Sequence, residues 1–161
     1  MSLTRPDVIS DIHRRYLEAG ADIITANTFS SQRVSQAEYH CGHLVKQLNT
    51  ESVRIAKGQA EAFSTTEKPR YVIATIGPTS KSLSISPDVN DPAFRAITYD
   101  ELYDAYREQA CALLEAGVDG ILVETVFDTL NAKAAMDAIE TAMQERDIRV
   151  PMMLSITVND R

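Results

Sequence analysis

The sequence predicts an α/β fold, specifically a partial (β/α)8 TIM barrel with about four parallel strands and intervening helices. Short apolar segments rich in β-branched residues alternate with longer segments of helical periodicity along the chain. A six-residue segment at a helix-to-strand junction is repeated 97 residues later. The expected strands end in polar residues, and barrel enzymes place their functional groups at that end.

The first half of the chain contains the first expected helices and strand. A helix is expected to begin with Thr4 as its N-cap and to end at Gly20, since threonine caps helices and glycine terminates them. Residues 21–29 are short, apolar and largely unalternated, which is typical of a parallel strand buried on both faces. Residues 30–43 are polar and predict a loop, and 44–63 predict a helix.

The second half continues the same alternation. The remaining elements are expected at 71–76 (strand), 98–117 (helix), 119–125 (strand), 130–144 (helix) and 151–158 (strand). Thr98 and Glu101 have the spacing of a capping box, which marks the start of a helix. Residues 80–97 contain two prolines and little periodicity, and loops of that length are usually functional or disordered.

The repeat supports a barrel rather than an open sheet. Five of the six residues that begin at Leu17 recur from Leu114 onward. The same shift aligns Asn27 with Glu124, and each is followed by a threonine. Two helix-to-strand units with polar strand ends are expected from a fold whose active site is assembled from those ends.

The length indicates an incomplete barrel. The chain has 161 residues, whereas a complete barrel typically takes about 250 and βα folds normally begin with a strand. This sequence begins with a helical pattern and ends just after a strand pattern. We therefore expect residues 1–161 to be a single fragment of a barrel that lacks the first strand and the later strands.

Composition excludes several classes of partner. A formal net charge of -7 repels phosphate backbones and anionic membranes, so neither nucleic acid nor a membrane is expected to bind. Two cysteines form no disulfide framework, and neither a secretory signal nor a long apolar run is present. A cytoplasmic location is therefore expected. Residues 1–3 show no targeting pattern and are left out of the fold prediction.

Glu124 is the foremost candidate for a functional residue. Its carboxylate ends an apolar run, and a partly buried carboxylate requires a cationic partner such as the amino group of a ligand. The alternative is a solvated strand end. Asn27 and Thr28 offer an amide and a hydroxyl either to a small polar ligand or to the adjoining loop. Gly77-Pro78 allows close backbone approach, but a simple turn has the same sequence.

Two clusters and one isolated cysteine contain side chains of the kind that bind metals. His40, Cys41 and His43 lie within four residues, yet structural zinc sites need four ligands and no second pair is present. No metal site is expected in this chain. Cys111 lies in the middle of an expected helix, where core packing is its ordinary role. Residues 88–91 contain hard-cation donors that are equally typical of turns.

Two segments identify a family resemblance. Residues 84–95 (SISPDVNDPAFR) and 123–135 (VETVFDTLNAKAA) closely resemble the homocysteine-binding domain of cobalamin-dependent methionine synthases. Residues 21–29 and 76–79 are similar to the wider homocysteine methyltransferase family. The resemblance implies a (β/α)8 barrel that transfers a methyl group from methylcobalamin, ultimately from 5-methyltetrahydrofolate, to zinc-activated homocysteine, giving methionine.

The resemblance also implies how the site residues are used. Glu124 would contact the substrate ammonium, with Asn27, Thr28, Gly77 and Pro78 as further substrate-binding candidates. The family's zinc ligands are three cysteines on later strands, which the sequence does not reach. Zinc and cobalamin are therefore expected in the parent protein and not on this fragment, which contains no catalytic residue and is expected to be inactive.

The partners implied are homocysteine and the cobalamin and folate modules of the parent chain. One alternative is a homocysteine methyltransferase that uses betaine or S-methylmethionine as the methyl donor. Another is a purely structural fragment that binds nothing. In either case the open edges of a partial barrel expose unpaired backbone groups, so self-association is expected.

Overall fold

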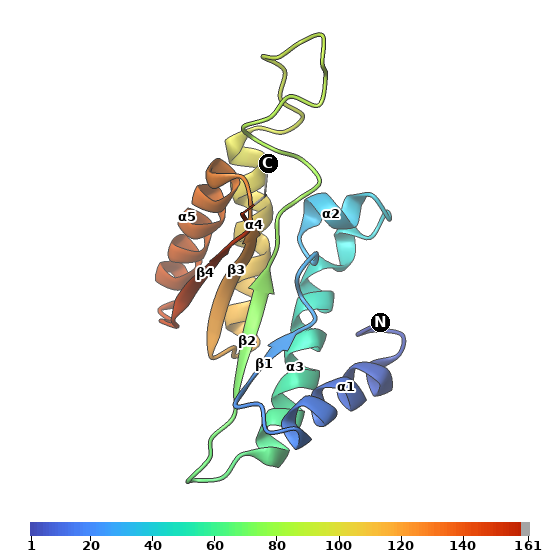
Figure 1. Cartoon of the computed structure of the whole chain (residues 1–161), viewed down its shortest axis with the longest axis vertical. Coiled ribbons are helices and arrows are strands. Elements are labelled where there is room, and N and C mark those ends of the chain that lie inside the picture. The colour runs from blue at the N-terminus through green and yellow to red at the C-terminus, as the bar shows by residue number, and fades with distance from the viewer. Residues whose placement is uncertain (159–161) are drawn as a thin grey trace.

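Four strands form one parallel sheet in the order β1-β2-β3-β4 (Figure 1). The computed structural model describes residues 1–158. The strands are β1 (Ile23–Ala26), β2 (Tyr71–Ile76), β3 (Gly120–Val126) and β4 (Met152–Ile156). The helices are α1 (Pro6–Glu18), α2 (Arg33–Ala37), α3 (Val45–Phe63), α4 (Tyr99–Glu115) and α5 (Thr129–Arg146), with a 3-10 turn, η1 (Gly42–Leu44), before α3.

All long helices lie on one face of the sheet (Figure 1). Strands adjacent in the sequence are adjacent in the sheet, and α1, α3, α4 and α5 pack against one another in chain order. A doubly wound sheet would place helices on both faces, whereas a β/α barrel places all of them outside. The predicted α/β fold, a partial barrel with four parallel strands, is confirmed.

The core lies between the sheet and the helix layer. Val72, Ala74 and Ile76 of β2 and Ile121 and Val123 of β3 are buried on this side. These residues alternate along their strands, so the intervening residues point to the opposite face. No helix of the described residues covers that opposite face.

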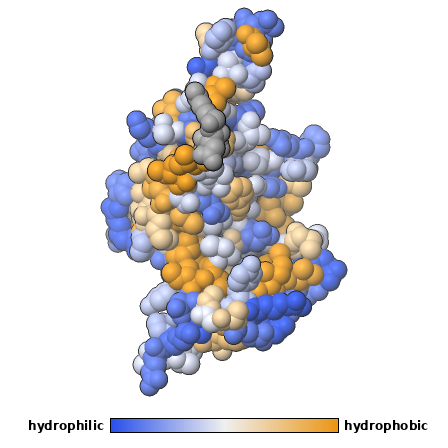
Figure 2. All heavy atoms as spheres, viewed as in Figure 1, coloured by the Kyte–Doolittle hydropathy of each residue, from blue (hydrophilic) through white to orange (hydrophobic). Residues whose placement is uncertain are grey.

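Burial on both faces was predicted for the strand segment 21–29, and this is wrong for β1. Ile24 and Ala26 are buried, whereas Ile23 and Thr25 are exposed. β4 is exposed along most of its length. The reason is that β1 and β4 are the edges of the described sheet, and its open face has no second layer. Figure 2 shows hydrophobic residues reaching the surface on this strand side of the molecule.

The two copies of the repeat have the same backbone geometry. Gly20 has φ 105° and Gly117 has φ 83°, and each follows the end of a helix. Both angles lie in the left-handed region, which glycine adopts without the steric cost of a Cβ. The predicted helix-to-strand correspondence is therefore confirmed.

Several local predictions need correction. The N-cap of α1 is Arg5 rather than Thr4 and makes no side-chain hydrogen bond, because Pro6 already occupies the first turn. The predicted loop 30–43 contains α2, whose N-cap Gln32 accepts a hydrogen bond from the Ser35 amide. Ser2 is buried, so the first residues do take part in the fold.

The capping box at the start of α4 is confirmed, with reciprocal hydrogen bonds between Thr98 and Glu101. The long segment 80–97 before it projects beyond the sheet and helices (Figure 1). Its base is nevertheless held in place, because Leu83 donates its backbone N–H to the Asn131 side chain at 3.0 Å. None of the helices in residues 1–158 combines the length and apolar content needed to cross a membrane.

Candidate functional site

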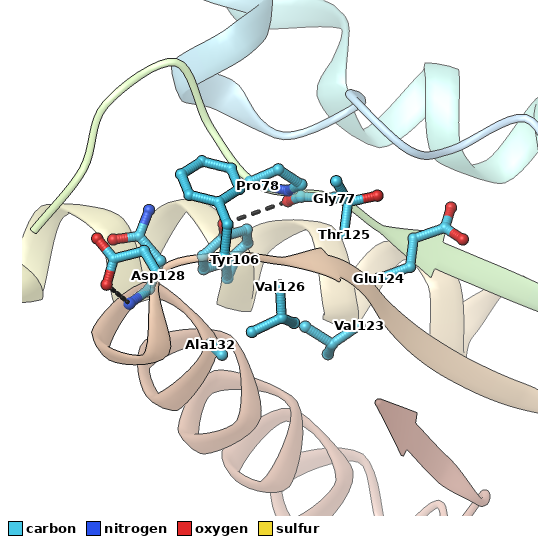
Figure 3. Close-up of a pocket in the computed structure, with 11 residues that line it drawn as sticks. Gly77, Pro78, Tyr106, Val123, Glu124, Thr125, Val126, Asp128 and Ala132 are labelled. Carbon is cyan, nitrogen blue, oxygen red and sulfur yellow. Dashed lines mark hydrogen bonds between the residues drawn. The ribbon is translucent and has the colours of Figure 1, made fainter. Parts of the chain in front are cut away.

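The C-terminal end of β3 presents a carboxylate to the open face of the sheet. Val123 and Val126 point toward α5, whereas the Glu124 side chain extends away from them (Figure 3). Ile76 of β2 pairs with Val123, so Glu124 lies level with Gly77, the residue that follows β2. Glu124 therefore lies at the rim where barrel folds assemble their active sites.

The backbone at this point is strained. Thr125 has φ 61°, in the left-handed region, and the pairing of β3 with β4 shifts register between Val123 and Val126. A β-branched residue is a genuine outlier in that region, at a cost of roughly 1–3 kcal/mol. Such strain persists only where the surrounding structure enforces it, and it concentrates at functional sites. The bulge interrupts the ladder directly beside Glu124.

Glu124 is partly buried, yet no donor within residues 1–158 forms a hydrogen bond or an ion pair with its carboxylate. By contrast, Asp119 at the other end of β3 has Lys57 at 2.9 Å and the Val72 amide at 2.7 Å. Within residues 1–158, the Glu124 carboxylate at the strand end therefore still requires a cationic partner. An alkylammonium group fits this requirement.

Asn27 follows β1 on the same face as Glu124, but it lies nearer to the N-terminal ends of the strands. Ala26 pairs with Ala74, so Asn27 leaves β1 at the level of Thr75. Its side-chain amide is exposed and donates to the Ser2 hydroxyl at 3.3 Å. No donor among the described residues forms a hydrogen bond with the amide oxygen of Asn27.

Thr28 is fully buried and serves the fold. Its hydroxyl donates to the Thr75 carbonyl at 2.8 Å and accepts from the Thr75 amide at 3.0 Å. These two bonds continue the ladder between β1 and β2 after β1 has ended. Of the two roles considered for Thr28, the geometry therefore favours loop capping over contact with a ligand.

The backbone of Gly77 is also used by the fold. Its N–H donates to the Phe29 carbonyl at 2.9 Å, and its carbonyl accepts from the Tyr106 hydroxyl at 3.2 Å. A Cβ at Gly77 would lie 2.6 Å from the Phe29 ring. The close approach that glycine allows is therefore made by Phe29, and Gly77-Pro78 presents no free backbone donor to a ligand.

The enclosed space behind the rim is too small for an amino acid. A cavity of about 10 Å³ lies between the ends of β2 and β3, with Tyr106 and Asn131 among its lining residues. Pockets that hold small molecules usually measure about 300–1,000 Å³. A substrate held by Glu124 would therefore sit on the open face and not in this cavity.

Asp128 links the rim to the projecting segment 80–97. It caps α5 and accepts hydrogen bonds from the hydroxyls of Ser82 (2.5 Å) and Ser84 (2.7 Å). Burial alone would raise the pKa of Asp128, but these bonds outweigh it and lower the pKa to about 2. Burial raises the pKa of Tyr106 on the other side of the cavity.

The described residues do not form a metal centre. Across residues 1–158, no three His, Cys, Asp or Glu side chains lie close enough together to hold an ion. The Cys41 thiol contacts the Tyr39 carbonyl at 3.2 Å. Cys111 is only partly buried and lies beside Arg107 and Arg146, so the predicted core packing holds in part. Residues 88–91 form turns in which Asp88 accepts from the Asn90 amide.

Sequence reasoning missed the buried polar residues that hold the rim loop after β1. Gln109 of α4 donates to the Thr28 carbonyl at 2.7 Å, and Asn49 of α3 donates to the Ser31 carbonyl at 2.9 Å. Both side chains are fully buried. Their signal in the sequence is an amide at an otherwise apolar helical position, which is costly unless it is hydrogen-bonded.

Comparisons with known proteins agree with this arrangement. The family model for homocysteine S-methyltransferase matches residues 1–161. The oxidised form of the homocysteine methyltransferase MmuM from Escherichia coli matches with a TM-score of 0.75 and 20% identity over 99% of this chain and 53% of that chain. The apo form of the same protein matches with a TM-score of 0.64 and 20% identity over 96% of this chain and 51% of that chain. The chain thus spans about half the length of these structures.

Proposed function

The chain belongs to the homocysteine S-methyltransferase family, and we propose that it supplies part of the substrate site of a barrel enzyme that converts homocysteine to methionine. In that reaction the homocysteine sulfur attacks the methyl carbon of a donor. A sulfur–carbon bond forms, the bond between the methyl group and the donor breaks, and the thiol proton is lost. The thiolate is the reactive form, since a thiol near its ordinary pKa of about 8.5 is mostly protonated at neutral pH.

Glu124 carries the proposal. Its carboxylate faces the open side of the sheet beside the strained Thr125, and no residue from 1 to 158 donates a hydrogen bond to it. Homocysteine carries an ammonium group that a carboxylate binds through charge-assisted hydrogen bonds. Glu124 would hold this group and thereby orient the thiol, without touching the reacting sulfur. The Asn27 side chain would contact the same substrate from a position nearer to the N-terminal ends of the strands.

For the methyl donor we propose methylcobalamin, supplied by a cobalamin module and recharged by a folate module. The support is the resemblance of residues 84–95 and 123–135 to the cobalamin-dependent branch. Betaine or S-methylmethionine remains the alternative donor, and the likeness to MmuM is compatible with it. Methionine formation by the enzyme that carries this chain, measured with each donor in turn, separates the two.

Zinc does not fit the residues described here. The free thiols of Cys41 and Cys111 lie on α2–η1 and α4 rather than at the strand ends, and residues 1–158 contain no cluster of three ligands. No step of the reaction is therefore assigned to zinc on this chain. A cytoplasmic location is part of the proposal and is supported by the two free cysteines.

Titration calorimetry with homocysteine and its des-amino analogue tests the proposal. The protein should bind homocysteine saturably, and Glu124→Gln should weaken binding on the order of tenfold to a hundredfold, because a charge-assisted hydrogen bond contributes roughly 1.5–3 kcal/mol. The variant should bind the analogue as the original protein does, since the analogue has no ammonium group.

The exposed Glu61 of α3 provides the matched control, as Glu61→Gln removes the same charge far from the rim. Equal affinity for homocysteine in the original protein and in Glu124→Gln would exclude the substrate role of Glu124. Absence of any binding heat in the original protein would instead favour a structural fragment.

A further inference from the structure

The turn after β1 is held through its backbone carbonyls. Every carbonyl from residue 27 to residue 31 accepts a hydrogen bond from a group outside these five residues, at distances of 2.7–3.0 Å. The donors are Ser52 and Asn49 of α3, Gln109 of α4, Gln36 of α2 and the N–H of Gly77 after β2. Most turns leave their carbonyls to water, so this one is fixed more firmly than a connecting turn requires.

Gln109 of α4 has a central place among these donors. Its Nε2 donates to the Thr28 carbonyl at 2.7 Å and to the Oδ1 of Asn49 at 3.3 Å. Asn49 in turn donates to the Ser31 carbonyl at 2.9 Å. Both amide side chains are fully buried. One side chain of α4 therefore holds the turn directly at Thr28 and, through Asn49, at Ser31.

Stability alone explains the amide of Gln109 poorly. Its Oε1 is buried and has no hydrogen-bond partner among residues 1–158. A buried polar side chain that is only partly satisfied stabilises a core less than an apolar side chain of the same shape. The Thr28 carbonyl also accepts from the Ser31 amide at 3.0 Å, so it does not depend on Gln109 for a donor. Placement of the turn is the better explanation for this residue.

α4 also relates this turn to the other strand ends. Tyr106 lies one helical turn before Gln109 on the same face, and its hydroxyl donates to the Gly77 carbonyl at 3.2 Å (Figure 3). Gly77 directly follows β2. The helix then leads into β3, the strand that carries Glu124. One helix therefore holds the ends of β1 and β2 and is followed directly by the strand of the proposed ammonium-binding carboxylate.

We propose, on the basis of the function proposed above, that Gln109 is a positioning residue for the substrate site. It fixes the Thr28 carbonyl and thereby the direction in which the Asn27 side chain meets homocysteine. Gln109 itself lies in the helix layer, behind the sheet, and does not touch the substrate.

Asn27 is suited to this kind of control because both of its neighbours are fixed. Ala26 pairs with Ala74 in the sheet, and Thr28 is held at its hydroxyl by Thr75 as well as at its carbonyl by Gln109. The backbone between two fixed residues has little freedom, so the Asn27 side chain keeps one direction on the open face. Loss of the bond from Gln109 releases one of the two sides.

A double-mutant cycle on homocysteine affinity, measured by titration calorimetry, tests this proposal. Gln109→Met keeps the length of the side chain but removes the donor, and Asn27→Ala removes the group that is positioned. Each single variant should bind homocysteine roughly threefold to tenfold more weakly, the range of one neutral hydrogen bond. The double variant should bind no more weakly than Asn27→Ala, because Gln109 acts through Asn27.

Arg70→Met is the matched control for general destabilisation. Arg70 donates to the carbonyls of Gly20 and Ala21 at 3.2 and 2.5 Å, in the turn at the opposite end of β1. Urea denaturation should show that this variant loses at least as much stability as Gln109→Met. Its homocysteine affinity should nevertheless stay within about twofold of the original protein, since the rim is untouched.

The cycle separates failure of this proposal from failure of the proposed function. Losses that add in the double variant, unchanged affinity in Gln109→Met, or an equal loss in Arg70→Met would overturn the role of Gln109 while homocysteine binding by the original protein stands. Absence of binding by the original protein would overturn both. Circular dichroism checks folding, and Gln109→Asn, which draws the amide back from Thr28, replaces Gln109→Met if that variant unfolds. Unfolding of both would show that the amide serves the fold and would overturn the positioning role.

Discussion

The ends of β1 and β3 occupy equivalent positions in the repeat but are used differently. At the end of β1, Thr28 is buried and its hydroxyl replaces a backbone partner for Thr75. At the end of β3, Thr125 is partly exposed in a strained conformation, and Glu124 has no internal donor within the described residues. The comparison shows that the polar groups at one strand end are used by the fold, while the carboxylate at the other has no partner among residues 1–158.

The largest expected effect is on stability at the end of β1. Thr28→Val keeps the shape but leaves the buried N–H and C=O of Thr75 without partners, which should lower the free energy of unfolding by about 3 kcal/mol. Urea denaturation measures the change. Thr125→Val is the control at the equivalent position and should shift stability by less than about 0.5 kcal/mol. Equal losses for both variants would contradict the comparison.

A second prediction concerns Asp128, just beyond the end of β3, whose carboxylate is used by the fold whereas that of Glu124 has no partner among residues 1–158. Asp128, four residues after Glu124, has a pKa of about 2, below its ordinary value of 3.8. Its charged form therefore stabilises the fold above about pH 4, and this contribution, about 2 kcal/mol, is lost as the pH falls through 2. Unfolding measurements on the original protein and Asp128→Asn should converge over that range. A constant difference between them would exclude the carboxylate as the cause.

Relief of backbone strain at the end of β3 should raise the free energy of unfolding, whereas the two preceding substitutions lower it. Thr125→Gly removes the Cβ from a left-handed residue, and we expect stability to rise by about 1 kcal/mol after the entropic cost of glycine. Thr25→Gly in β1 is the matched control and should destabilise, because its backbone is an ordinary strand. Thermal unfolding distinguishes the two signs. A loss of stability in Thr125→Gly would mean that the conformation is not strained.

The smallest effect is expected from Glu124→Gln on stability. No donor in residues 1–158 is lost, so the free energy of unfolding should change by less than about 0.5 kcal/mol or rise slightly as a desolvated charge is removed. Asp119→Asn should cost more, because Asp119 binds both Lys57 and the Val72 amide. A large destabilisation by Glu124→Gln would indicate that this carboxylate serves the fold.

The fold was predictable from the sequence because its signals are local. The alternation of elements, the capping box at Thr98 and the two glycines of the repeat depend on neighbouring residues only. Burial of β1 was predicted wrongly, since exposure depends on what covers the open face of the sheet. The apolar composition of the strand contains no information on that point.

The candidate site was predictable only in part. A carboxylate after an apolar run marked Glu124, and the structure places it at the rim. The roles of Thr28 and Gly77 depend on Thr75 and on the Phe29 ring, contacts that link separate strands and loops and leave no local pattern. The left-handed conformation of Thr125 contradicts the preference of its side chain, so no propensity could have indicated it.

The hydrogen bonds that Asp128 and Asn131 form with the projecting segment impose an order on folding during synthesis. Residues 80–97 are synthesised before α5, yet the amides of Leu83 and Ser84 are held by side chains at its N-terminal end. During synthesis the contacts of these two amides therefore form only after α5 has emerged and docked. Hydrogen exchange at these two amides would report the docking of α5, because they become protected only when that late step is complete.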